Sequence, residues 1–393
     1  MTRRDDAAEV GGADPLDREM GHRPVPVTVP WFTPIFRSRV ALGMGPITAP
    51  AVLFVPLGYL MGPSVAGILS QTAVAQLDPV VSVALAALGV FVGLALDLRT
   101  ADARRLFVAA SAEACITVAT VAVFTSLLLW QWQLPLGVGA TFVALVLGVS
   151  ASASSATSAA AGPHPSLGVA SRIADLDDVL PIAIGAGLVA SLAATSFADG
   201  VRLLVLTAAL GLTIAVAGWL LFERARSAAE RVVFVGGALM LLGGAAAYLS
   251  LSPLMTGMVA GLFWTFSPGR ADQVIREDVQ KLQHPLVVLL LITAGASLVY
   301  SPLALWLFAP FTVFRLTGKL LGGRAAAALS GGLAPADLGA WLLPPGLLGI
   351  AFALNVEQVG ASPAGGALLF AVVVGSIASE VIAVAVAPGR GRD

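Results

Sequence analysis

The sequence predicts an all-α membrane protein that crosses the bilayer many times. Of its 393 residues, 58% are hydrophobic and only 11% are charged, whereas a soluble domain carries roughly 25% charged residues. The mean hydropathy is +0.91. Apolar stretches long enough to cross a hydrocarbon layer of about 30 Å recur from residue 46 to residue 387. Each crossing must be helical, because lipid cannot satisfy free backbone groups.

The apolar stretches divide into twelve predicted spans. They lie near residues 44–62, 78–98, 105–129, 136–161, 167–194, 200–221, 231–250, 252–267, 284–300, 302–329, 338–359 and 365–387. With this count, the basic residues of the connections gather on one side, and the opposite connections hold only Arg202. Cytoplasmic connections carry the excess of lysine and arginine. We therefore expect a multi-pass protein of the bacterial inner (plasma) membrane with both termini in the cytoplasm.

The ends of the chain differ from its apolar middle. Residues 1–39 are rich in acids, arginine and proline, a composition typical of disorder. We expect a cytoplasmic tail there, a membrane domain over residues 40–387, and a short cytoplasmic C-terminus over residues 388–393. Cys115 is the single cysteine, which excludes an internal disulfide and a cysteine-based metal site. No motif for a cofactor or for nucleic acid is present, so we expect neither.

Two spans are predicted to be interrupted. The fourth holds six hydroxyl residues between Ser150 and Ser158, and serine and threonine compete for backbone hydrogen bonds. The eleventh contains Pro344, Pro345 and Gly346, which remove helix donors and permit a bend. Spans three to five and ten to twelve would form an inverted repeat whose middle members are broken and meet near the midplane. Alternatively, both stretches only help helices to pack.

The fifth span carries three acids, Asp175, Asp177 and Asp178. If its helix begins near Leu167, Asp178 lies roughly 16 Å along it, near the centre of the bilayer. Alternatively, the helix starts at Asp175 as its N-cap, which would leave the next two acids at the membrane surface. Arg172 and Asp175 are three residues apart, a spacing at which they would pair at the cytoplasmic edge.

A pair of neighbouring acids at membrane depth indicates an ion-transport site. A single charge there costs about 2.5–3.5 kcal/mol even on the lenient insertion scale. Side chains of adjacent helical residues point about 100° apart, so one carboxylate can face a cation while the other meets a different partner. Close carboxylates resist joint ionisation and titrate as a unit. Cations and protons would thus compete for Asp177 and Asp178.

Four further charged residues lie inside apolar spans. Arg315 and Lys319 are four residues apart on one face of the tenth span. A buried Lys319 needs a counter-ion, and Asp177 or Asp178 is the natural candidate. Alternatively, both bases snorkel to the cytoplasmic surface. Glu113 and Glu380 are either hydrogen-bonding partners in helix packing or accessory proton groups.

Several motifs resemble the sodium/proton antiporters of the cation–proton antiporter superfamily. The double aspartate is the most specific of them. The matching stretches are Gly58–Ser64, Val92–Arg99, Asp177–Leu180, Thr293–Leu298 and Gly318–Gly322. The similarity covers roughly residues 46–387.

The resemblance implies an antiporter that exchanges Na⁺ (or Li⁺) for H⁺, and not an enzyme. Asp178 would be the principal carrier of cation and proton, and Asp177 would pair with Lys319 and add to Na⁺ binding. The supporting residues would be Ser154, Ser155 and Thr157 of the broken fourth span, together with Asp175 and Arg315. Double-aspartate members are typically electrogenic. They work as dimers in which a core, here residues 105–194 and 302–387, moves against a dimerisation part.

Other functions stay open. A potassium/proton antiporter or potassium-efflux protein could use the same scaffold. Sodium-coupled symport of an organic anion is a further possibility, and the positive charge of Arg315 is the feature that indicates it. The chain also departs from the family pattern: the stretch from Thr157 to Asp178 is short, an acid found in some members' broken fourth helix is absent, and Asp175 and Arg315 are extra charges. An intramembrane aspartyl protease is disfavoured, because it needs its two aspartates on different helices.

Overall fold

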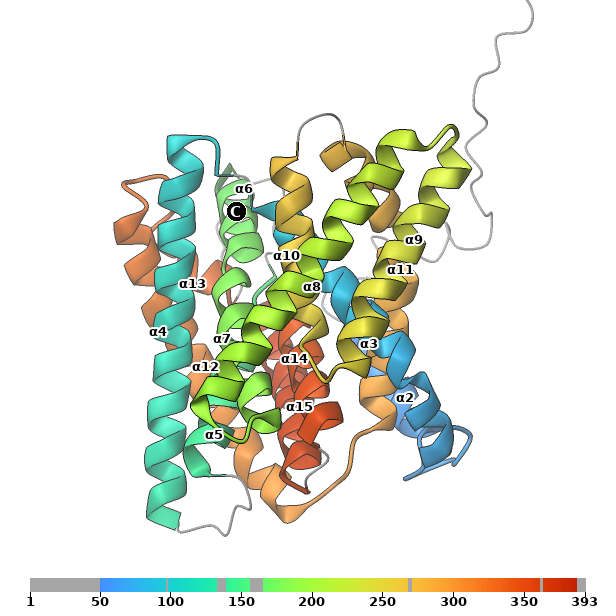
Figure 1. The fold of residues 1–393 in the computed structure, drawn as a ribbon. Coiled ribbons are helices and arrows are strands. Elements are labelled where there is room, and N and C mark those ends of the chain that lie inside the picture. The colour runs from blue at the N-terminus through green and yellow to red at the C-terminus, as the bar shows by residue number, and fades with distance from the viewer. Residues whose placement is uncertain are drawn as a thin grey trace, which may run out of the picture. The chain divides into compact units, whose positions relative to one another are not determined.

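The computed structural model describes residues 50–96, 98–132, 139–155, 165–267, 271–360 and 363–386. These residues form a bundle of α-helices, and within them no β-strand is assigned (Figure 1). The all-α prediction is therefore confirmed. The predicted tail over residues 1–39, the C-terminal segment over residues 388–393, and Thr157 lie outside the described residues.

Helices succeed one another with short connections. The first part of the chain forms α2 (Pro50–Met61), α3 (Gln71–Ala95), α4 (Ala101–Trp132), α5 (Ala140–Ser152), α6 (Pro165–Leu176), α7 (Val179–Ala193) and α8 (Phe197–Arg224). The second part forms α9 (Ala228–Tyr248), α10 (Pro253–Phe266), α11 (Ala271–Ala296), α12 (Pro302–Leu329), α13 (Leu338–Trp341), α14 (Leu347–Gly360) and α15 (Pro363–Val386). Each predicted span coincides with helical residues.

Length and composition make this a multi-pass membrane protein. In the described residues, seven helical segments are long and apolar enough to cross a bilayer, with α6 and α7 counted together as one segment. Shorter apolar helices occupy the remaining predicted spans, so the exact number of crossings stays a prediction. Large apolar side chains such as Val205, Val233 and Met240 are exposed on the outer helices, as expected for surfaces that face lipid.

Serine residues mark several helix starts. In each case the serine hydroxyl accepts a hydrogen bond from a backbone N–H three residues further on, which satisfies one of the free donors of the first turn. The capping residues are Ser70, Ser196, Ser227, Ser252 and Ser301, at the starts of α3, α8, α9, α10 and α12.

Reciprocal glycines bring α3 and α10 into backbone contact. A Cβ added at Gly89 would lie 2.0 Å from the carbonyl oxygen of Leu254, and one added at Gly257 would lie 2.0 Å from that of Ala86. Helices α2 and α11 approach each other similarly around Gly295, where an added Cβ would lie 2.2 Å from the carbonyl oxygen of Val55. Only glycine allows such separations, so these helix pairs are tightly joined.

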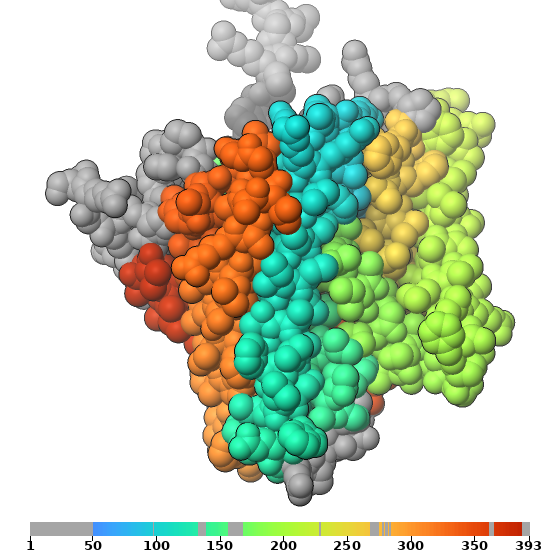
Figure 2. All heavy atoms as spheres, turned by 90° about the vertical axis from the view of Figure 1, so that its left-hand side faces the viewer, coloured from blue at the N-terminus to red at the C-terminus, as the bar shows by residue number. Residues whose placement is uncertain are grey.

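Helices α4 and α12 lie alongside each other on one face of the bundle (Figure 2). Glycines again permit the contact. A Cβ added at Gly318 would lie 3.1 Å from the Cα of Thr117, and one at Gly322 would lie 2.8 Å from the carbonyl oxygen of Glu113. This contact sets the distance between the charged residues of the two helices.

The two predicted broken spans are interrupted and cross each other, as the sequence predicts. After α5, the chain is extended at Ser154, which forms an isolated antiparallel bridge with Pro345 between α13 and α14. The backbone N–H of Ser155 donates to the carbonyl of Pro344 over 3.0 Å, and that of Gly346 donates to the carbonyl of Ala153 over 3.1 Å. Non-helical backbone at membrane depth needs such internal partners. One of these two crossing segments lies in the half from α4 to α7 and the other in the half from α12 to α15, in the arrangement of the predicted inverted repeat.

Candidate functional site

Asp177 and Asp178 lie at a break between two helical segments. Helix α6 ends at Leu176 and α7 begins at Val179, although the membrane span continues from Gly168 to Ala193. Four residues after Asp177, Pro181 has no N–H to donate to the Asp177 carbonyl. The helix begins at Pro165, so the alternative start at Asp175 is wrong. The two acids do lie within one helical span, as expected, but its hydrogen-bond ladder is interrupted beside them, and Pro181 is the signal that could have predicted this interruption.

The two carboxylates are held differently. Asp177 is fully buried, whereas Asp178 is partly exposed. The Oδ1 atom of each is buried and has no hydrogen-bond partner among the described residues. Buried polar atoms are nearly always hydrogen-bonded in proteins. These oxygens can therefore accept a proton or a cation without first losing another bond.

Lys319 lies beside Asp177 in the interior. Its Nζ is 3.1 Å from Asp177 Oδ2 and 3.2 Å from Ser154 Oγ, and it also donates to the carbonyl of Ser152. The lysine is fully buried, so the alternative in which it snorkels to the surface is wrong. Of the two candidate counter-ions, Asp177 is the one that pairs with Lys319.

Glu113 also forms an ion pair with Lys319, and this pair was not predicted from the sequence. Its Oε1 and Oε2 lie 3.0 Å and 3.1 Å from Lys319 Nζ. Glu113 is fully buried on α4, and the hydroxyl of Thr117 donates to its Oε1 over 2.8 Å. Neither reading of Glu113 made from the sequence included an ion pair with lysine. One ammonium thus lies between two carboxylates from different helices.

The hydroxyl residues of the broken fourth span divide into two roles. The Ser154 hydroxyl donates to Asp177 Oδ2, so it belongs to the charged cluster. The Ser155 hydroxyl donates to the carbonyl of Pro345 over 3.0 Å, and its bond joins the two crossing segments.

Arg315 joins the same crossing from α12. Its Nη1 donates to the carbonyl of Leu343 over 2.7 Å, and its Nη2 donates to the carbonyl of Ala153 over 3.1 Å. These carbonyls follow helix ends, where backbone acceptors lack helical partners and positive charge is favourable. Arg315 is fully buried, so the alternative in which it snorkels to the surface is wrong. The single side chain of Arg315 thus bonds to both interrupted segments.

The remaining predicted residues lie apart from the cluster around Lys319. Glu380 is buried on α15, and Arg315 is the cation that acts on it electrostatically. Asp175 is exposed and lies within electrostatic range of Arg172 and Arg276. In the described residues, no group of three or more histidine, cysteine, aspartate or glutamate side chains is arranged to hold a metal ion.

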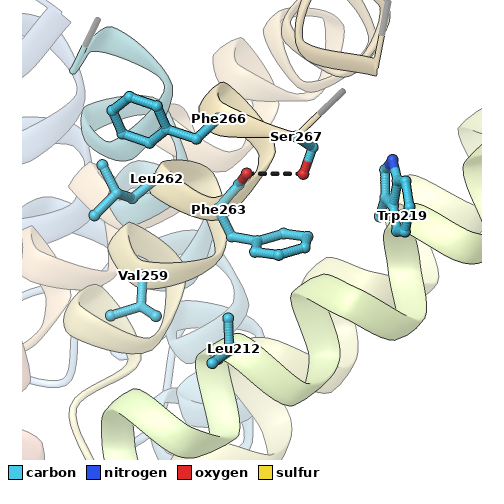
Figure 3. Close-up of a pocket in the computed structure, with 7 residues that line it drawn as sticks. All are labelled: Leu212, Trp219, Val259, Leu262, Phe263, Phe266 and Ser267. Atoms are coloured by element: carbon cyan, nitrogen blue, oxygen red, sulfur yellow. Dashed lines mark hydrogen bonds between the residues drawn. The ribbon is translucent and has the colours of Figure 1, made fainter. Parts of the chain in front are cut away.

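A cavity lies away from these charges, between α8 and α10 (Figure 3). It has a volume of about 450 Å³ and its walls are almost wholly apolar. The lining residues are Leu212, Trp219, Val259, Leu262, Phe263, Phe266 and Ser267. Ser267 Oγ donates to the Phe263 carbonyl over 2.8 Å within the same helical region. Without a charged group, this cavity offers nothing to hold a small cation.

Comparison with known proteins supports the fold. No protein-family model matches the chain, and no curated protein is significantly similar to it in sequence. The structure of the sodium proton antiporter MjNhaP1 from Methanocaldococcus jannaschii is similar to this chain, with a TM-score of 0.60. The likeness covers 91% of this chain and 96% of that chain, at 15% sequence identity. The two proteins therefore share a fold, which is the fold that the sequence motifs predicted.

Proposed function

We propose that this protein is a secondary active antiporter that exchanges Na⁺ (or Li⁺) for H⁺ at Asp177 and Asp178. One observation carries the proposal. Two adjacent carboxylates lie at a break inside a membrane span, each with a buried oxygen that has no hydrogen-bond partner among the described residues, beside a buried lysine. A likeness in fold to a solved sodium proton antiporter supports it.

The chemistry of the break suits a small hard cation. Such ions prefer carboxylate, carbonyl and hydroxyl oxygens. Asp177 and Asp178 supply free carboxylate oxygens, and the Asp177 carbonyl lacks its helical donor because of Pro181. Asp178 is the more accessible of the two acids, so it is the better candidate for exchange with water. In our proposal, Asp178 is the principal carrier, and Asp177 is the second ligand.

Exchange follows from competition for the same oxygens. A bound cation requires both carboxylates to be ionised, whereas protonation removes the charge that holds the cation. Two acids can carry two protons in one direction and share a single cation in the other, so we propose that transport is electrogenic. The broken segments cross close to the site, as in transporters whose sites lie at the midplane.

The cellular setting is also part of the proposal. We place the protein in the bacterial inner membrane with both termini in the cytoplasm, because lysine and arginine favour one set of connections. The moving body would comprise residues 105–194 and 302–387, which contain the buried charges. The other helices would form the fixed part and the contact between two copies of a homodimer.

Proteoliposomes that contain the full chain and a pH-sensitive dye test the proposal. A sodium gradient should drive proton flux, and Asp178→Asn should abolish it because a neutral amide carries neither ion. Asp102→Asn, which changes an exposed acid at the start of α4, should leave the flux unchanged. Undiminished sodium-driven flux in the Asp178→Asn variant would refute the assignment.

Changing the gradient distinguishes the alternatives. Flux that follows K⁺ and ignores Na⁺ and Li⁺ would instead identify a potassium/proton antiporter or potassium-efflux protein. Flux that appears only when an organic anion is added would indicate symport. A membrane potential imposed with valinomycin and potassium tests the charge balance, since electrogenic exchange must speed up or slow down with its sign.

A further inference from the structure

The ammonium of Lys319 has more acceptors than it has protons. An ammonium carries three N–H donors, yet the side chains of Glu113, Asp177 and Ser154 and the carbonyl of Ser152 all lie within hydrogen-bonding distance of Nζ. Without Asp177, three of these acceptors remain, and one of them is a carboxylate. Lys319 can therefore release Asp177 and stay both fully hydrogen-bonded and charge-compensated.

Helix packing fixes Glu113 in place. Glycines of α12 bring its backbone close to α4, so that a Cβ at Gly322 would lie 2.8 Å from the Glu113 carbonyl oxygen. The hydroxyl of Thr117, one turn further along α4, donates to Glu113 Oε1 over 2.8 Å. Because Glu113 and Lys319 lie on two helices packed along their length, their ion pair persists when other parts move.

Asp177 differs from Glu113 in its backbone and in one carboxylate oxygen. It lies at the break between α6 and α7, outside the regular hydrogen-bond ladder on its C-terminal side. Its Oδ2 accepts from Ser154 and Lys319, while its Oδ1 has no hydrogen-bond partner among the described residues. Asp177 therefore has an oxygen available for a new partner, whereas both oxygens of Glu113 lie within hydrogen-bonding distance of Lys319 Nζ.

We propose that Glu113 is a positioning residue that holds the Lys319 ammonium while Asp177 turns to the cation. The inference rests on the proposed exchange of Na⁺ for H⁺. In the cation-loaded state, Lys319 is paired with Glu113, and Asp177 and Asp178 share the ion. When the cation has left and before protons bind, Lys319 is shared between Glu113 and Asp177. Glu113 thereby weakens the hold of lysine on Asp177 and raises the affinity for the cation.

Sodium-dependent proton flux in proteoliposomes tests this role through the apparent KM. Glu113→Gln keeps the shape of the side chain and removes its charge, so Lys319 has Asp177 as its remaining carboxylate. We expect the KM for Na⁺ to rise roughly tenfold, a usual size for coupling between neighbouring groups, with the maximal rate nearly kept. Glu113→Asp retains the charge and should restore part of the affinity.

Two buried threonines of α4 provide a matched pair of controls. Thr117→Val removes the hydroxyl that holds Glu113 and should raise the KM about threefold. Thr125 is equally buried, but its hydroxyl has no hydrogen-bond partner among the described residues. Thr125→Val should therefore leave the KM unchanged. If Glu113→Gln does not fold, the comparison between Thr117→Val and Thr125→Val carries the test.

The outcomes separate the two proposals. Absence of cation-driven flux in the unaltered protein would overturn the proposed function together with this inference. Normal flux in the unaltered protein, with the same KM in the Glu113→Gln and Thr117→Val variants, would overturn the role of Glu113 alone. A purely structural Glu113 would lower the yield of folded protein without changing the KM, and this result would also refute the inference.

Discussion

Two regions of this molecule differ in whether buried charges join their helices. In the glycine-packed region (α2, α3, α10 and α11), helices touch through backbone, and added Cβ atoms would lie as close as 2.0 Å to a neighbouring carbonyl. In the site region (α4 to α7 and α12 to α15), glycines also permit close contacts, and buried charged side chains join the helices as well. All five charged residues that are buried in the described part of the chain belong to the site region: Glu113, Asp177, Arg315, Lys319 and Glu380.

The difference indicates which region can change its contacts. Backbone contact through reciprocal glycines has one favourable arrangement, and any separation loses packing on both sides. A shared ammonium with surplus acceptors has several arrangements of similar energy. The site region also keeps buried oxygens of Asp177 and Asp178 that have no hydrogen-bond partner among the described residues. The side chains that can exchange partners therefore gather in the site region.

The largest expected effect comes from removing the shared cation. Lys319→Gln leaves Glu113 and Asp177 as buried acids without their counter-charge, and loss of one partner of a buried pair costs about 3–5 kcal/mol. We expect a much lower midpoint of thermal unfolding in detergent and no sodium-driven flux. Adding Glu113→Gln should recover part of the lost stability. Unfolding at the normal temperature in Lys319→Gln would show that the cluster contributes little to stability.

A smaller effect is expected in the glycine-packed region. Gly257→Ala places a Cβ 2.0 Å from the Ala86 carbonyl oxygen, so α3 and α10 must separate. Overpacking of this kind costs about 1–3 kcal/mol, which thermal unfolding would detect. Gly244 on α9 is the matched control, because a Cβ there meets nothing within 4 Å. Equal stability of the Gly257→Ala and Gly244→Ala variants would contradict the tight contact.

The smallest effect concerns a contact between the two regions. Gln358 of α14 donates to Asp78 Oδ1 of α3 over 2.9 Å, at a partly buried position. Gln358→Ala should lower stability by only about 0.5 kcal/mol, because a single hydrogen bond has a small net value. Gln131→Ala, which changes an exposed glutamine of α4, is the control. A loss as large as that in Lys319→Gln would mean that the regions are firmly joined here.

Much of the fold could be predicted from the sequence, because the bilayer restricts the choices. Long apolar stretches must be helical, and prolines and hydroxyl residues disturb helices wherever they lie. The crossing of the broken segments at Ser154 and Pro345 followed from these local effects. The ends of the helices were less predictable. Helix α11, for example, begins at Ala271 rather than near residue 284, because its polar first turns need no apolar stretch.

The site was predicted in part. Asp177 and Lys319 pair as expected, because a buried charge needs a partner and few candidates were available. Glu113 was named, but its contact with Lys319 joins residues 206 positions apart and depends on how closely α4 approaches α12. The distance between these two helices depends on their packing and cannot be read from the residues near Glu113 in the sequence. The role of Arg315 was missed for the same reason, since its acceptors are backbone carbonyls that become free only when both helices break.

The position of Cys115 has a practical consequence. It lies two residues from Glu113, about 200° around α4, so it faces outward while the acid is buried. As the single thiol of the chain, it accepts a spin label without any engineered change. Dipolar spectroscopy on the labelled protein would report whether copies associate, through a single inter-label distance. Recorded with sodium and then at low pH, the same distance would track α4 through the transport cycle.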